Sequence, residues 1–191
     1  MQRLFTVVVA GSFLVAGALA QTSEVNQREK NQQERIANGV KDGQLTAGET
    51  QRLERKEAGI KNQIHQDRAA NGGRLTGQEK TQINREDNRL SQKIYSDKHN
   101  NAKPAFGNNE IGQRRENQQD RIANGIASGR LTPGEASRME GQEKSLNREI
   151  GTQRALNGGR LTGAEKRADN QQLNRQSQLD FPKKHNRRKG Y

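Results

Sequence analysis

The apolar residues after position 20 recur at the spacing of an α-helix. Leu53, Ile60 and Ile64 lie seven and four residues apart, and two further segments repeat this spacing: Ile83, Leu90 and Ile94, and Met139, Leu146 and Ile150. Such spacing places one narrow apolar stripe on each helix. The surrounding residues are mostly Glu, Gln, Arg, Lys and Ala, which favour helices. The pattern therefore predicts an all-α fold, with helices over 24–42, 47–71 and 77–97.

A long internal repeat divides the chain into two homologous parts. The segment NQQERIANGV at 31–40 matches NQQDRIANGI at 117–126, and the offset of 86 residues continues to Leu75 and Leu161. The intervening segment, NAKPAFGNN, has the Pro, Gly and Asn content of a linker. We therefore expect two homologous three-helix units in tandem, followed by a basic tail. Their predicted bounds are 21–100 for the first unit, 101–109 for the linker, 110–180 for the second unit and 181–191 for the tail.

The last helix of the second unit departs from its counterpart. Asp169 stands where the first unit has Ile83, and Gln176 stands where it has Leu90. Leu173 and Leu179 are spaced to supply a shifted apolar stripe. Pro182 is predicted to end this helix, because proline lacks the backbone N–H of a helical residue.

The phrase Gly-x-Leu-Thr-x-x-Glu occurs four times and predicts a joint between helices. A glycine can adopt the left-handed conformation that ends a helix. The Thr side chain can cap the next helix, while the Glu three residues later bonds back to the Thr N–H as a capping box. The Leu is expected to turn inward and close the end of the helix pair. The predicted capping pairs are Thr46–Glu49, Thr76–Glu79, Thr132–Glu135 and Thr162–Glu165.

The same phrase resembles the second half of an EF-hand loop, in which Gly43, Leu45 and Glu49 fit three of the expected positions. The resemblance implies a calcium site with oxygen ligands from two loops: Asn38, Asp42 and Glu49 in the first unit, and Asn124, Ser128 and Glu135 in the second. Val40 and Ile126 occupy positions where a ligand is expected, which leaves both loops short of calcium ligands. Capping joints are thus the preferred interpretation, and a calcium site is the alternative.

Residues 1–20 have the features of a bacterial signal peptide. Arg3 precedes an apolar run, and Ala18-Leu19-Ala20 is an A-x-A cleavage site. The run is too short for a good membrane span, and we predict no transmembrane span in the mature chain. Cleavage after Ala20 would release a periplasmic or secreted protein. In general character the chain resembles small secreted bacterial helical proteins with degenerate EF-hand-like repeats, a resemblance that implies export and no particular activity.

Composition argues against an enzyme. The chain has no Cys, which excludes thiolate metal sites and Cys nucleophiles. It has no nucleophile elbow, Walker phrase or dinucleotide fingerprint. The three histidines, at 65, 99 and 185, are not spaced as a metal cluster, and His99 and His185 are interpreted as solvated helix ends. Glu24–Arg28 and Glu57–Lys61 are expected to be exposed ion pairs on helices. Only 28% of the residues are hydrophobic, which predicts a thin core.

The net charge of +12 points to a polyanionic partner. Residues 21–100 carry 15 basic and 12 acidic residues, and residues 101–180 carry 13 and 10. The helices are therefore expected to be nearly balanced in charge. The tail has five bases and no acid, and is predicted to dominate binding through these residues: Lys183, Lys184, Arg187, Arg188 and Lys189.

The sequence thus predicts an exported, non-enzymatic helical binding or scaffold protein. The expected partner is anionic lipid, acidic polysaccharide or DNA bound without sequence specificity, and a homo-oligomer is compatible with the sequence. The alternative is a divalent-metal-binding protein that uses the EF-hand-like loops.

Overall fold

Six α-helices joined by short turns make up the described part of the chain, as the apolar spacing predicts. The computed structural model describes the backbone of residues 14–185 and the side chains of residues 24–178, and this part contains no strand. The helices are α1 (Leu14–Lys41), α2 (Ala47–Ala70), α3 (Gly77–Lys98), α4 (Glu110–Ala127), α5 (Pro133–Leu156) and α6 (Gly163–His185).

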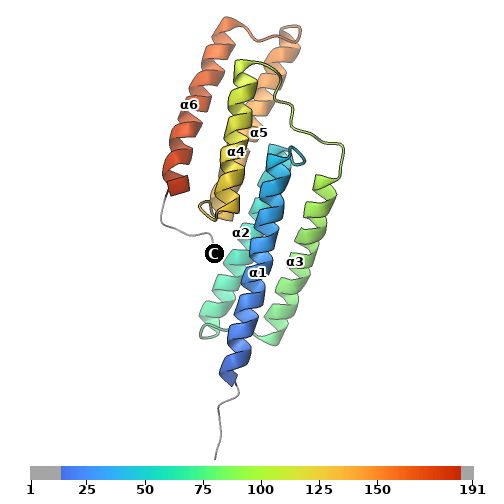
Figure 1. Cartoon of the computed structure of the whole chain (residues 1–191), viewed down its shortest axis with the longest axis vertical. Coiled ribbons are helices and arrows are strands. Elements are labelled where there is room, and N and C mark those ends of the chain that lie inside the picture. Colours follow the sequence, from blue (N-terminus) through green and yellow to red (C-terminus); the bar gives the residue numbers. More distant parts are fainter. Residues whose placement is uncertain (1–13, 186–191) are drawn as a thin grey trace, which may run out of the picture.

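The helices form two groups of three stacked along the long axis of the molecule (Figure 1). α1, α2 and α3 form one group, and α4, α5 and α6 form the other. The most extensive contacts nevertheless join the groups, because α2 packs on α5 and α1 packs on α4. In the view of Figure 1, α2 and α5 lie behind α1 and α4. The arrangement is compatible with a tandem of three-helix units whose inner ends interlock.

Equivalent residues of the two groups make equivalent contacts. Arg28 on α1 donates hydrogen bonds to Asn84 and Asn88 on α3, at 3.0 and 2.6 Å. The residues 86 positions later repeat these bonds between α4 and α6: Arg114 donates to Asn170 at 2.6 Å and to Asn174 at 2.5 Å. Where α2 crosses α5, Ser137 donates to the carbonyl of its own equivalent, Gln51, at 3.2 Å. Equivalent positions that meet each other indicate an approximate twofold relation between the halves.

The main apolar core belongs to both groups. One cluster contains Leu53 and Ile60 from the first half together with Ile122, Ile126 and Met139 from the second. A smaller cluster fills the outer end of the second half and consists of Ile111, Leu146, Ile150 and Leu173. The core is thus continuous across the junction, because each half contributes the apolar stripe that the other half covers.

All four predicted capping boxes are present. At the first, Thr46 donates its backbone N–H to the Glu49 carboxylate at 2.9 Å, and the Glu49 N–H donates to the Thr46 hydroxyl at 3.3 Å. The same pair of bonds forms at the other three joints. Gly43, two residues after α1, has a φ of +62°, the left-handed conformation that a glycine was expected to supply there.

The leucine of each inner joint closes the end of a helix pair, and a glycine makes room for it. Leu45 and Leu131 are fully buried. Leu131 lies so close to Gly125 that a methyl group on that glycine would be 2.6 Å from the Leu131 Cδ1. Gly39 has the same relation to Leu45, at 2.7 Å. The repeated Ile-Ala-Asn-Gly sequence and the Leu of the joint are therefore one packing unit.

The ends of the chain differ from the sequence prediction. α1 begins at Leu14, inside the predicted signal peptide, and residues 1–13 lie outside the described residues. α6 continues through Pro182 to His185, so the prediction that the helix ends at this proline is wrong. Leu173 is buried as the shifted stripe predicts, while the side chain of Leu179 lies outside the described part. None of the described helices is long and apolar enough to cross a membrane.

The contact between glycine and leucine generates the first prediction. Gly125→Ala should lower the free energy of unfolding by about 1–3 kcal/mol, because the added methyl overlaps Leu131. The matched control is Gly151→Ala on α5, where a Cβ meets no atom within 4 Å. The control should raise stability by about 0.5–1 kcal/mol, since alanine is the better helix former. Urea unfolding of both variants measures the difference, and equal stabilisation by both would contradict the packing account.

Candidate functional site

The fold separates acidic from basic side chains. Between residues 24 and 178 the chain has 21 Asp and Glu residues, of which nine are buried. Over the same range it has 28 Lys and Arg residues, of which only Arg115 is buried. The surface of this part is consequently far more basic than its sequence. The prediction that the helices present a nearly balanced surface is wrong, because helical position sends many of the carboxylates inward.

The excess of basic charge is unopposed on the outer sides of α2 and α5. Every fully exposed Lys, Arg, Asp or Glu side chain on these two helices is basic. The exposed bases are Arg52, Arg55 and Lys56 on α2, and Arg138 and Arg148 on α5. Half-buried Lys144 joins them across the helix pair: a methyl group on Gly48 would be 3.5 Å from the Lys144 Cδ and 3.8 Å from the Arg52 Nη1. We refer to these six bases as the α2–α5 face.

The outer sides of α1 and α4 carry mixed charge. Glu24 and Glu34 are exposed on α1 beside Lys30 and Lys41. The exposed charged side chains of α4 are Glu110, Glu116, Asp120 and Arg121. These helices lie in front of α2 and α5 in Figure 1. Among the described side chains, acids therefore outnumber bases at the exposed positions of α1 and α4, whereas the exposed charged side chains of the other four helices are all basic.

The acids missing from the surface of the first half lie inside it. Glu29 of α1, Glu54 and Glu57 of α2, and Asp87 of α3 are buried. Gln33 donates to both Glu54 oxygens at 3.3 and 3.2 Å, and the Arg28 Nε lies 3.8 Å from Asp87. In the described structure, the Glu57 Oε2 and both Asp87 carboxylate oxygens have no hydrogen-bond partner.

Glu57 corrects a sequence prediction. It was expected to be exposed and paired with Lys61, but it is 2% exposed. Its position explains the difference, because Glu57 lies four residues after Leu53 and three before Ile60 and so belongs to the apolar stripe of α2. The signal for a buried acid was present in this spacing.

Burial gives these carboxyl groups an unusual affinity for protons. It raises the pKa of Glu54 to about 8 and that of Glu57 to about 9, and the neighbouring carboxyls add to the rise at Glu57. Desolvation also raises the pKa of Glu29 and of Asp87. Glu54 and Glu57 are therefore protonated and uncharged at neutral pH. These two carboxyls therefore add no negative charge to offset the surface bases.

The second half neutralises its buried acids with a buried base. Arg115 occupies the position of Glu29 and is 2% exposed. Desolvation lowers the pKa of Arg115, and Arg154 lowers it further, while Glu143 and Asp169 oppose this shift. Asp169 and Leu173 are the equivalents of Ile83 and Asp87, and all four residues are buried. The acid and the apolar residue, which lie one helical turn apart, have therefore exchanged positions between the two halves.

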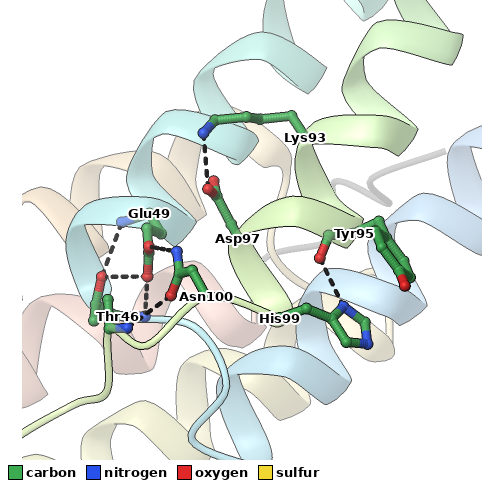
Figure 2. A network of polar contacts seen from close by, with 8 residues as sticks. Thr46, Glu49, Lys93, Tyr95, Asp97, His99 and Asn100 are labelled. Atoms are coloured by element: carbon green, nitrogen blue, oxygen red, sulfur yellow. Dashed lines mark hydrogen bonds and ion pairs between the residues drawn. The ribbon is translucent and has the colours of Figure 1, made fainter.

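The structure uses the predicted calcium ligands for other contacts. The carboxylates of Glu49 and Glu135 face the N-termini of their own helices in capping boxes. Asn100 donates to the Glu49 Oε1 at 2.6 Å, which ties the end of α3 to this joint (Figure 2). Although burial raises the pKa of Glu49, hydrogen bonds from Thr46 and Asn100 hold it below its usual value.

The remaining predicted calcium ligands are exposed near the ends of α1 and α4. Asn38 and Asp42 are exposed, and the Ser128 hydroxyl donates to the Asn124 carbonyl at 2.6 Å. Within residues 24–178, no three His, Cys, Asp or Glu side chains are grouped to hold a metal ion.

The other predicted functional residues lie at helix ends or outside the described side chains. The His99 Nδ1 is 2.7 Å from the Tyr95 carbonyl oxygen, and its ring stacks on Tyr95 (Figure 2). Of the predicted tail, Lys183, Lys184 and His185 belong to the backbone of α6, with side chains outside the described part. Arg187, Arg188 and Lys189 lie outside the described residues altogether.

The buried carboxyls predict a stability that falls as pH rises. A folded-state pKa raised above the unfolded value of 4.5 gives stability that is complete below about pH 4.5 and is lost as pH rises towards about 8–9. Glu57→Gln removes one of these protons, so it should flatten the decline and add about 1–3 kcal/mol at pH 8. Urea unfolding between pH 4 and 9 measures the effect.

The matched control is Glu143→Gln, the equivalent substitution in the second half. It should not stabilise the protein, because Glu143 offsets the buried charge of Arg115. An unchanged pH slope in Glu57→Gln would show that Glu57 is ionised in the folded protein.

Comparison with known proteins adds no functional information: no family model, curated protein or solved structure matches this chain.

Proposed function

We propose that this protein is an exported, non-enzymatic helical binding protein that contacts a polyanion through the α2–α5 face. The observation that carries the proposal is the charge on these two helices, where the exposed charged side chains are all basic. Their acidic residues are buried or half-buried, including the three carboxylates of Glu49, Glu54 and Glu57 on α2. The signal-peptide sequence supports export.

The shape of the face suits a polymer or a charged surface better than a small molecule. α2 and α5 have 24 residues each, which corresponds to about 36 Å per helix. Bases spread along such helices can contact several phosphates, sulfates or carboxylates at once. Each contact releases a condensed counterion, so the affinity should depend strongly on salt concentration and little on sequence.

The basic tail is proposed to extend this surface. Its five bases lie within residues 183–189, shortly after the part of α6 whose side chains are described, and no acidic residue lies among them. We expect the face and the tail to contribute jointly. The net charge along the sequence favoured the tail alone, because that sum includes acidic residues that the fold buries.

The face is tested by charge neutralisation. Arg52→Gln, Arg55→Gln and Lys56→Gln in one protein should reduce the dependence of log affinity on log salt by about 2–3 for duplex DNA, because about 0.9 counterion is released per contact. The matched control neutralises three exposed bases on the opposite side: Lys30, Lys41 and Arg121. The control should change the slope by less than about 1. Anionic vesicles and an acidic polysaccharide, titrated in parallel, identify the preferred polymer. Equal losses in both variants would show that the face has no special role.

The contribution of the tail is tested by truncation. A chain that stops at Asp180 should still bind the polyanion, with lower affinity and a shallower salt slope, because the α2–α5 face remains. Titrations at several salt concentrations compare it with the full mature chain. Complete loss of binding would transfer the function to the tail, and an unchanged slope would exclude the tail.

A further inference from the structure

A cavity of about 300 Å³ lies where the linker between the two halves packs against the helices. The linker residues Pro104, Ala105 and Phe106 form one side of it, and Ile150 and Gly151 of α5 contribute another. Thr46 and Ala47 of the first half also contribute to the lining. This volume is at the lower end of the range found for small-molecule sites.

The cavity is lined by three cations and no carboxylate. Lys103, Arg115 and Arg154 all contribute to its wall. The Arg154 guanidinium lies over the linker, since a methyl group on Gly107 would be 3.6 Å from both of its terminal nitrogens. On its other side, Arg154 lines a more open hollow with Arg160 and Lys166, where Glu110 is the one acidic lining residue. An anion that enters the cavity itself meets three cations and no carboxylate.

Arg115 provides a donor that the described protein leaves unused. Its side chain is buried, and its ring contact is with Phe106, whose centroid lies 5.2 Å away. Its Nη1 donates to the Ala105 carbonyl at 3.3 Å, but within the described residues its Nε has no hydrogen-bond partner. A buried guanidinium N–H without an acceptor is costly, and an anion would satisfy it. Asn147 also lines the cavity, with an unpaired buried side-chain oxygen.

We propose that this cavity binds a small organic anion that combines a phosphate or carboxylate group with an apolar part. Arg115 and Arg154 hold the anionic group, and Phe106, Pro104 and Ile150 contact the apolar part. Glu143 and Asp169 lie within electrostatic reach of Arg115 and favour its charged form. The site joins both halves and the linker, so occupancy stabilises their junction. It is independent of polyanion binding, because only Arg154 and Lys103 are surface cations and neither belongs to the α2–α5 face.

The test is an NMR titration of the full mature chain with phenyl phosphate in 150 mM NaCl. The amide signals of Ala105, Phe106 and Gly151 should shift together with a Kd below about 1 mM. Phenol and inorganic phosphate, titrated separately, should each bind at least about tenfold more weakly, because each supplies only half of the ligand. Inorganic phosphate that binds as tightly as phenyl phosphate would overturn the apolar subsite.

Matched substitutions locate the site. Arg154→Gln should weaken phenyl phosphate binding by about tenfold or more, the scale of a lost charge-assisted hydrogen bond. Arg121→Gln, the same charge change at an exposed position of α4 outside both the cavity and the α2–α5 face, should weaken it less than about twofold. Arg154 is half-buried rather than buried, so the variant should fold, and thermal unfolding checks this. Equal weakening by both variants, or no binding by the folded wild-type chain, would overturn the proposal.

Discussion

The narrowness of the apolar stripe on each helix is the constraint on which the rest of this structure depends. A stripe of one apolar residue per turn encloses only a small core between three helices, such as the cluster of Ile111, Leu146, Ile150 and Leu173. The two halves meet this constraint by sharing a larger core: Leu53 and Ile60 pack in the same cluster as Ile122 and Met139. The extensive α2–α5 and α1–α4 contacts follow from it. Each half therefore buries apolar side chains of the other half.

The same constraint places carboxyl groups inside the protein. Positions that a wider stripe would fill with Leu or Ile are filled by Glu54, Glu57 and Asp87, whose methylene groups pack while their polar ends lose water. Burying an uncharged carboxyl group costs less free energy than burying a charged one, and the pKa values of Glu54 and Glu57 are raised for this reason. In the second half, the buried guanidinium of Arg115 instead offsets the charge of buried Glu143 and Asp169. The narrow apolar stripes thus explain both why acidic residues lie in the interior and why basic residues predominate at the surface.

The two halves differ where the proposed ligand cavity lies. The replacement of Glu29 by Arg115 and the presence of a linker beside it break the approximate twofold symmetry at one place. The linker then covers the buried arginine through Phe106 and Ala105. The proposed ligand cavity therefore lies at the junction of the halves, where the linker adds contacts that are not part of the repeat.

The sequence by itself determined the features that depend on local chemistry, and it did not determine those that depend on long-range contacts. The helices, their joints and the four capping boxes depend on residues three or four positions apart, and the spacing of Thr46 and Glu49 or the glycine at 43 was sufficient to predict them. The shifted stripe at Leu173 followed from the same periodicity. Which acids are buried depended on contacts between helices: Glu57 lies on a stripe that only the packed bundle covers. The α2–α5 face joins residues that come together only when the halves pack on each other, and the contact of Arg115 with Phe106 depends on how the linker packs on α4. Tertiary structure decided the charge of the surface, because burial, and not composition, determines which charges meet the solvent.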